Sequence, residues 1–349
     1  MSRPWPQYEA IELGLKNYWY PVVSSRRLRK KPLPLQAFDE KIVLIRDQGR
    51  AYALTDRCPH RATPLSLGRR DFPGTITCSY HGWCYNLGTG ELMAALTDGP
   101  QSPMVGKASV RTYPVEERIG LVWVYMGEGT PPPVEEDILE ELLDPELAIC
   151  TRISNQEGNW RYAVENHFDE AHASYLHRNA IYSLFRRLPA WRHGLKVVHN
   201  GAWLERRFDG EEFGGEYPRL GYWPRKNFWD FDRRARVKVS VRLPGTGKVT
   251  RRQFTAYKFF VPIGKDRFRF VQLATTRAGR LGRAVFRIRY WLYRRWLYHI
   301  FFNDQDMLMT RVSHTEGPEQ LFRPDASIIA WRKLCEEARS GKAGGLSQK

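Results

Sequence analysis

Two short stretches of this sequence each combine a cysteine with a histidine at a spacing typical of metal ligands. The first contains Cys58 and His60, the second contains Cys78 and His81, and seventeen residues separate the two pairs. Two thiolates and two imidazoles can hold one tetrahedral zinc ion. They can also hold a [2Fe–2S] cluster, in which the thiolates bind one iron and the imidazoles bind the other.

The arrangement of the four side chains favours the cluster over zinc. Zinc fingers place cysteine with cysteine and histidine with histidine, whereas each pair here contains one of each. Each loop would therefore supply one ligand to each iron. Pro59 and Gly82 fit tight turns whose backbone N–H groups can point at sulfides. We therefore expect a cluster held by Cys58, His60, Cys78 and His81.

A second group of candidate ligands follows in the pattern Asp-x-x-His-x4-His, formed by Asp169, His172 and His177. On an ideal helix Asp169 and His172 share a face. His172 and His177 lie about 140° apart, so both reach one metal only if the helix ends or bulges, for which residues 173–175 are a suitable place. Two histidines and a carboxylate form the facial triad of non-haem Fe(II) oxygenases. Taken singly, a histidine of this segment, His167 included, is more often an exposed or core residue.

Short strands separated by turns are expected around the first group, from about residue 40 to 130. Residues 41–46 and 51–54 flank a hairpin turn, and residues 120–126 form an apolar strand. The Gly/Pro-rich stretch 127–133 marks a boundary. The part of the chain around the cysteines is therefore predicted to be an all-β module.

After the boundary the pattern mixes strands and helices. Residues 195–275 alternate in strand fashion, and helical spacing is found at 137–143, 160–175, 280–302 and 328–339. An antiparallel sheet with helices on either side of it in sequence is typical of the α+β class. The segment 287–302 mixes arginine with aromatic residues. It suits either a membrane-surface helix or a helix packed on the sheet, and we favour the packed helix with its arginines towards solvent or a partner.

Composition narrows the class of protein. The formal net charge of +17 suits either a solvated basic surface or an acidic partner such as an electron-carrier protein. Neither a zinc-finger spacing nor an RNP signature indicates nucleic acid. Five cysteines, two of them beside histidines, favour metal binding in a reducing cytoplasm over a disulfide framework. No secretory leader and no run of about 18 apolar residues is present. We expect a cytoplasmic protein without peripheral membrane contact.

The two motifs together resemble those of Rieske non-haem iron ring-hydroxylating oxygenases, in their alpha or oxygenase component. The cysteine pairs stand in Cys-Pro-His-Arg and Cys-Ser-Tyr-His-Gly-Trp, without the extra loop cysteines of high-potential respiratory Rieske proteins. Residues 16–22, 111–116 and 327–334 are similar to the carbazole-dioxygenase type. The spacing between the two iron histidines is longer than in carbazole oxygenases, so the substrate does not follow from the resemblance.

The resemblance implies an α+β fold with an N-terminal all-β Rieske domain and a C-terminal helix-grip catalytic domain. We expect residues 1–39 to pack with the catalytic domain, residues 40–133 to form the Rieske domain and residues 134–349 to form the catalytic domain. The family pattern makes His172 and His177 iron ligands. Asp306 is the predicted third ligand, with Asp304 as the alternative.

Two further residues receive roles from the same resemblance. Asp169 is expected to hydrogen-bond a cluster histidine across a subunit boundary and relay electrons, and Asn166 to lie near the iron. The implied enzyme takes electrons from a ferredoxin or reductase and uses O2 to hydroxylate an organic substrate of the aromatic, polycyclic or heterocyclic class, as a homotrimer. The alternative is a Rieske-type electron-transfer protein or a metal-stabilised binding protein without oxygenase activity.

Overall fold

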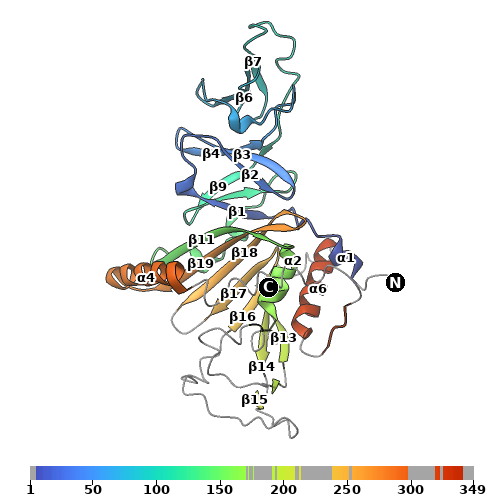
Figure 1. The fold of residues 1–349 in the computed structure, drawn as a ribbon, viewed down its shortest axis with the longest axis vertical. Helices are drawn as coiled ribbons and strands as arrows, with labels where there is room; N and C mark the ends of the chain where they lie inside the picture. Colours follow the sequence, from blue (N-terminus) through green and yellow to red (C-terminus); the bar gives the residue numbers. More distant parts are fainter. Residues whose placement is uncertain are drawn as a thin grey trace. The chain divides into compact units, whose positions relative to one another are not determined.

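The computed structural model describes residues 5–169, 172, 176, 191–192, 195–208, 212–213, 238–250, 254–297, 319–322 and 325–340. The chain divides into two compact units (Figure 1). The N-terminal unit comprises residues 13–144 with 261–264. The C-terminal unit comprises residues 1–12, 145–260 and 265–349.

The N-terminal unit contains three small sheets in its described residues. Their strand orders are β2-β3-β4-β8, β5-β6-β7 and β1-β10-β9. The strands are β1 Trp19–Ser24, β2 Leu33–Ala37, β3 Glu40–Asp47, β4 Arg50–Thr55, β5 Thr75–Thr77, β6 Trp83–Asn86, β7 Leu92–Ala95, β8 Thr112–Tyr113, β9 Val115–Arg118 and β10 Leu121–Tyr125. The predicted all-β character of this part of the chain is confirmed.

Local sequence explains the best-defined hairpin of this unit. β3 pairs with β4 from Ile42 to Asp47, and Asp47 stands opposite Arg50. Gln48 and Gly49 between them both have positive φ, 45° and 81°. A two-residue turn of this kind matches the natural twist of the paired strands. The predicted hairpin is therefore confirmed, with its turn at the residues expected.

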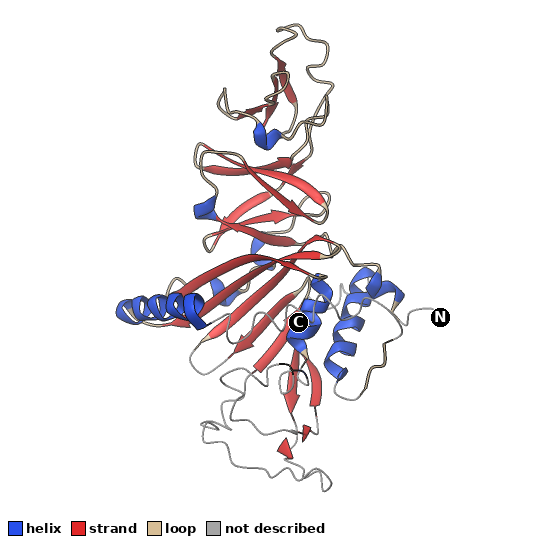
Figure 2. Cartoon of the chain, viewed as in Figure 1, coloured by secondary structure: helices blue, strands red, loops and turns tan. Residues whose placement is uncertain are grey.

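The C-terminal unit contains a seven-stranded antiparallel sheet in its described residues, in the order β11-β19-β18-β17-β16-β14-β13 (Figure 2). The strands are β11 Leu147–Glu157, β13 Leu195–Asn200, β14 Trp203–Phe208, β16 Lys238–Arg242, β17 Thr246–Thr250, β18 Thr255–Gly264 and β19 Arg267–Arg277. The short strands β12 Trp191–Arg192 and β15 Glu212–Phe213 form a separate pair. The alternating pattern in the second half of the sequence is thus confirmed as sheet.

Helices precede, interrupt and follow this sheet in the chain. They are α1 Pro6–Glu9, α2 Trp160–Phe168, α4 Arg280–Leu292 with a π-helical turn at Tyr293–Leu297, and α6 Ala326–Arg339. No helix within the described ranges is both long enough and apolar enough to cross a membrane. The sheet with its accompanying helices confirms the α+β class.

One predicted helix, at residues 137–143, is wrong. Only a 3-10 turn forms there, Glu140–Leu143, and Asp144 after it has an extended backbone with ψ 117°. Asp144 precedes Pro145, and a residue before proline is sterically biased away from the α region. Four residues between two extended ones leave no room for an α-helix.

The unit boundaries differ from the expected domain limits of 39 and 133. Within residues 1–39, only residues 1–12 belong to the C-terminal unit, and residues 134–144 belong to the N-terminal one. Strand pairing accounts for the first difference, because β1 pairs with β10 and β2 pairs with β3. A hydrogen bond of 2.7 Å from the backbone N–H of Trp19 to the Asp137 carboxylate accounts for the second.

Candidate functional site: two Cys-x-His loops and the end of helix α2

The first Cys/His loop follows β4 and is closed by its own backbone. The N–H of Cys58 donates to the carbonyl of Thr63 at 2.8 Å, and the N–H of Ala62 donates to the carbonyl of Cys58 at 2.9 Å. The Asp56 carboxylate accepts from the backbone N–H and the hydroxyl of Ser66, at 2.6 and 2.7 Å. These bonds fix the loop that carries Cys58 and His60 at both of its ends.

The second Cys/His loop connects β5 to β6 and is equally tight. The N–H of Cys78 donates to the carbonyl of Trp83 at 2.8 Å, and the N–H of Gly82 donates to the carbonyl of Cys78 at 3.1 Å. Gly82 has φ 65°, and a Cβ there would lie 3.0 Å from the Cβ of Leu96. Glycine allows both the positive φ and the close approach of Leu96, as expected for a sharp turn directly after His81.

The two loops bring the four predicted cluster ligands to one end of the unit, with the sulfurs inside and the imidazoles outside. Cys58 and Cys78 are each 2% exposed, whereas His60 is exposed and His81 half-buried. The His60 and His81 rings lie 4.6 Å apart between centroids. Two buried thiols and two neighbouring surface imidazoles fit a cluster with one Cys-ligated and one His-ligated iron.

The surroundings of the thiols also fit a bound cationic centre. Burial raises the pKa of the Cys78 thiol, and the neighbouring Cys58 raises it further, while the backbone N–H groups of Tyr80 and His81 act in the opposite direction. Two adjacent thiolates in this buried setting are unfavourable without a metal charge between them. The N–H groups aimed at Cys78 are the outer hydrogen bonds expected of an iron–sulfur ligand.

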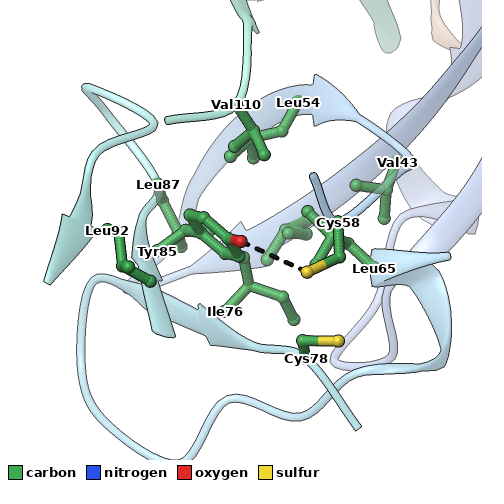
Figure 3. Packing of buried hydrophobic residues seen from close by; sticks show 11 residues of the cluster. Val43, Leu54, Cys58, Leu65, Ile76, Cys78, Tyr85, Leu87, Leu92 and Val110 are labelled. Atoms are coloured by element: carbon green, nitrogen blue, oxygen red, sulfur yellow. Dashed lines mark hydrogen bonds between the residues drawn. The ribbon is translucent and has the colours of Figure 1, made fainter. Parts of the chain in front are cut away.

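A hydrophobic cluster packs around Cys58 and Cys78 of the two loops (Figure 3). Tyr85, fully buried, places its hydroxyl 3.2 Å from the Cys58 sulfur. Burial and the nearby thiol raise the pKa of Tyr85 well above its usual value, so its hydroxyl stays protonated and can donate to a thiolate. Trp83, two residues earlier on the same face of β6, stacks on His60 with ring centroids 4.9 Å apart and an interplanar angle of 9°.

The second group of predicted site residues lies at the C-terminal end of α2. Asn159 caps the start of this helix, accepting from the N–H of Arg161 at 3.0 Å and donating to the Lys265 carbonyl at 2.6 Å. The helix ends at Phe168, and Asp169 has an extended backbone with ψ 134°. The predicted continuous helix over 160–175 is therefore wrong in its length. A break falls at Asp169, and residues 173–175, where an irregularity between the two histidines is expected, lie outside the described residues.

Beyond the end of α2, two of the predicted residues still come together. Nδ1 of His172 lies 3.2 Å from Oδ2 of Asp169, and both side chains are less than one-fifth exposed. Asn166, one turn before Asp169 on α2, is half-buried. His177, Asp304 and Asp306 lie outside the described residues, so the iron ligand set as a whole stays a prediction.

A buried ion pair that the sequence did not reveal holds α2 in place. Arg332 of α6 donates from Nε and from a terminal nitrogen to the Glu165 carboxylate, at 2.7 and 3.0 Å. Both side chains are almost fully buried, and Arg332 also bonds to Glu319. Burial lowers the pKa of Arg332, but the bonds to Glu165 and Glu319 outweigh burial and raise this pKa above its usual value. The two residues are 167 positions apart in the sequence, so no local pattern predicts their pairing.

Among the described residues, no three histidine, cysteine, aspartate or glutamate side chains are placed as ligands of a single ion. His177, Asp304 and Asp306 are not among the described residues.

Comparisons with known proteins agree with this site. Residues 18–114 match the family model of the Rieske [2Fe–2S] domain, and residues 125–209 match that of a homotrimeric ring hydroxylase. The chain belongs to the Rieske non-haem iron ring-hydroxylating oxygenases, as an alpha subunit. The predicted family and cofactor domain are confirmed.

Within this family the chain is similar to carbazole 1,9a-dioxygenase. It is 29% identical to the terminal oxygenase component from Sphingomonas, over 97% of this chain and 96% of the relative. The terminal oxygenase from Nocardioides aromaticivorans has a TM-score of 0.81 and 28% identity, covering 97% of this chain and 99% of that one. A carbazole-bound complex of oxygenase and ferredoxin gives a TM-score of 0.81 at 29% identity, covering 97% and 94%.

Proposed function

We propose that this chain is the terminal oxygenase of a ferredoxin-dependent system that hydroxylates an aromatic, polycyclic or heterocyclic compound with O2. The observation that carries the proposal is the Asp169–His172 pair, because a Rieske electron carrier needs the cluster loops alone. The similarity to carbazole dioxygenase extends over 97% of the chain and so includes this second region. One of the similar structures is a complex with ferredoxin and bound carbazole.

Each metal centre has a defined set of candidate ligands in this proposal. Cys58, His60, Cys78 and His81 hold the [2Fe–2S] cluster, and a mononuclear Fe(II) is held by His172, His177 and Asp306, with Asp304 as the alternative carboxylate. When bound, the two centres supply one-electron transfer and O2 activation. We assign no substrate beyond its class, since carbazole and fluorene are ligands of the relatives.

The chain's own residues prepare both centres. Oδ2 of Asp169 accepts the Nδ1 proton of His172, which leaves Nε2 of the same ring with its lone pair available as a ligand. The surface positions of His60 and His81 suit them to pass electrons to a neighbouring chain, where Asp169 would meet them in a homotrimer. The ferredoxin or reductase would approach the same unit as an acidic partner of this basic chain.

Metal content and spectra test the proposal directly. The holoenzyme should contain about three irons per chain, from two in the cluster and one in the mononuclear site. It should also show a Rieske EPR signal and consume O2 with a ferredoxin and a panel of polycyclic substrates. His172→Ala should keep the EPR signal, lose about one iron and lose substrate-dependent O2 uptake.

The alternatives give different results in the same measurements. Two irons per chain in the wild-type protein, with no O2 uptake on any substrate, would indicate an electron carrier. A colourless protein containing zinc would overturn the cluster assignment as well. Retained turnover in His172→Ala would remove His172 from the ligand set.

A further inference from the structure

Helix α4 exposes an apolar stripe. Leu281, Val285, Ile288 and Leu292 are 79%, 45%, 59% and 44% exposed, and Trp291 beside them is 60% exposed. Their spacing of four, three and four residues places the four aliphatic side chains on one face of the helix. Figure 1 shows α4 extending beyond the ends of β11 and β19. A helix of a soluble domain normally turns such a stripe towards the core.

The opposite face of α4 is the one that contacts the sheet. Arg283, Phe286 and Tyr290 are the half-buried residues on that side, again spaced by three and four residues. Arg283 donates to the carbonyl of Pro145, two residues before β11 begins, at 3.5 Å. The expectation of a helix packed on the sheet therefore holds for one face only, and the large aliphatic residues are the ones left in water.

The charges in the first turn of α4 oppose the helix dipole. Residues 280–297 contain six arginines, and residues 267–303 contain no aspartate or glutamate. The first turn of α4 has no acidic residue, and its N-cap, Gly279, makes no side-chain bond. Arg280 and Arg283 stand there instead, where the helix dipole favours negative charge. Arg280, which is exposed, fits an anionic surface outside the chain.

We propose that α4 binds the surface of a bilayer that contains anionic lipid. The aliphatic stripe enters the boundary between headgroups and acyl chains, Trp291 lies at the headgroup level, and the flanking arginines contact lipid phosphates. The helix lies in the plane of the surface and does not cross it. The proposed oxygenase would then bind its hydrophobic substrate at the bilayer, where such compounds accumulate.

Two other occupants of this face fit the charges or the stripe less well. A second copy of the chain that met this face with its own α4 would bring two sets of these arginines together, with no acidic residue on either segment. An acidic electron carrier would match the arginines, but docking through surface charges would leave the four aliphatic residues without a use. The bilayer satisfies both the stripe and the arginines.

The test is co-sedimentation of the holoenzyme with vesicles of phosphatidylcholine, with and without about 30% phosphatidylglycerol. We expect binding to the anionic vesicles only, and weaker binding in about 0.5 M salt. Leu281→Ser/Ile288→Ser should weaken binding by more than about tenfold, because two inserted side chains are lost. Arg280→Gln/Arg289→Gln should weaken it about 25-fold, at about fivefold for each arginine.

The matched control is Lys30→Gln/Lys31→Gln, which removes the same charge from exposed positions of the N-terminal unit and should leave vesicle binding unchanged. Hydrogen exchange locates the contact in the unmutated protein, where vesicles should protect the amides of α4. Absence of vesicle binding, or binding without protection of α4, would overturn the proposal. So would a lowered oligomeric mass or weaker ferredoxin binding in the Leu281→Ser/Ile288→Ser variant, if vesicle binding were unaffected.

Discussion

The cluster loops and the end of α2 use opposite ways of placing metal ligands. All four candidate cluster ligands fall between Cys58 and His81, and each loop is closed by backbone hydrogen bonds within a few residues. The candidate iron ligands extend from His172 to Asp306, and the helix leading to them is tied to α6 through Arg332. A site built from local turns should tolerate distant changes, and a site built from distant segments should not.

The largest effect should come from Cys78→Ser. The variant removes a buried thiolate ligand, and a hydroxyl does not replace it on iron. We expect complete loss of the cluster's visible absorption and EPR signal, loss of about two irons per chain, and no O2 uptake. Optical and EPR spectra with iron analysis measure all of these.

Cys84→Ser is the matched control for that variant. Cys84 is a second buried thiol close in sequence, and it accepts a hydrogen bond from the Thr77 hydroxyl at 3.5 Å. A serine there should leave the spectra unchanged. Equal loss of the cluster in both variants would mean that any buried thiol change disrupts the fold, and it would withdraw Cys78 as a specific ligand.

Asp169→Asn should have the next largest effect, on rate and not on metal content. The amide keeps the size of the side chain but loses the charge that orients His172, which lies 3.2 Å away. Outer hydrogen-bond partners of ligand histidines typically contribute about 10- to 100-fold to activity. We expect turnover to fall by about 100-fold while cluster absorption and iron content stay normal.

Single-turnover kinetics distinguish the two roles open to Asp169. A relay role predicts slow oxidation of the cluster after mixing the reduced enzyme with substrate and O2. A purely orienting role predicts normal cluster oxidation with less product. Asp266→Asn, an exposed carboxylate in the same unit, should change neither, and unaltered kinetics in Asp169→Asn would eliminate both roles.

The contrast between the two regions also explains what could be read from the sequence. Cys58, His60, Cys78 and His81 were identified because turn residues and ligands occur in one short pattern, and the structure brings them together. The hairpin at Gln48 and Gly49 was predictable for the same reason. The end of α2 at Asp169 was not predicted because neither glycine nor proline marks it.

Residues that act over long separations carried no such signal. Glu165 looked like any polar helix residue, and its partner Arg332 stands 167 residues away. Tyr85 could have been found, since Trp83 and Tyr85 alternate on one strand directly after a ligand loop. The helix at 137–143 was wrongly predicted because its apolar spacing was given more weight than the effect of Pro145 on Asp144, the residue before it.

Glu165→Gln should destabilise the C-terminal unit while leaving the cluster-bearing N-terminal unit folded. It removes one charge of a buried ion pair, a change that typically costs about 3–5 kcal/mol, and we expect about 3 kcal/mol because Arg332 keeps its bond to Glu319. Chemical denaturation followed by tryptophan fluorescence measures the loss, and iron at the second site should be lost first. The cluster's visible absorption should persist at denaturant concentrations that already release the mononuclear iron.

The double variant Glu165→Leu/Arg332→Met tests whether the lost stability comes from the unpaired buried charge of Arg332. Replacing both charges by apolar groups removes the desolvation cost as well as the attraction, so it should recover part of the lost stability. Glu117→Gln breaks a partly exposed pair with Arg46 in the N-terminal unit and should cost only about 1 kcal/mol or less. An equal loss from Glu117→Gln would contradict the claim that the C-terminal unit depends more on its ion pair.

Tyr85→Phe should give the smallest effect, on the electronic properties of the cluster alone. The hydroxyl 3.2 Å from the Cys58 sulfur stabilises negative charge on that sulfur, and the charge is larger in the reduced cluster. A hydrogen bond of about 1 kcal/mol corresponds to about 40 mV for one electron, so the reduction potential should fall by about that amount. Tyr113→Phe, which loses a hydroxyl bonded to Glu40 at 2.6 Å, is the control and should leave the potential unchanged. An unchanged or higher potential in Tyr85→Phe would show that the hydroxyl does not donate to the Cys58 sulfur, since a ligand thiolate has no proton to give and could only accept.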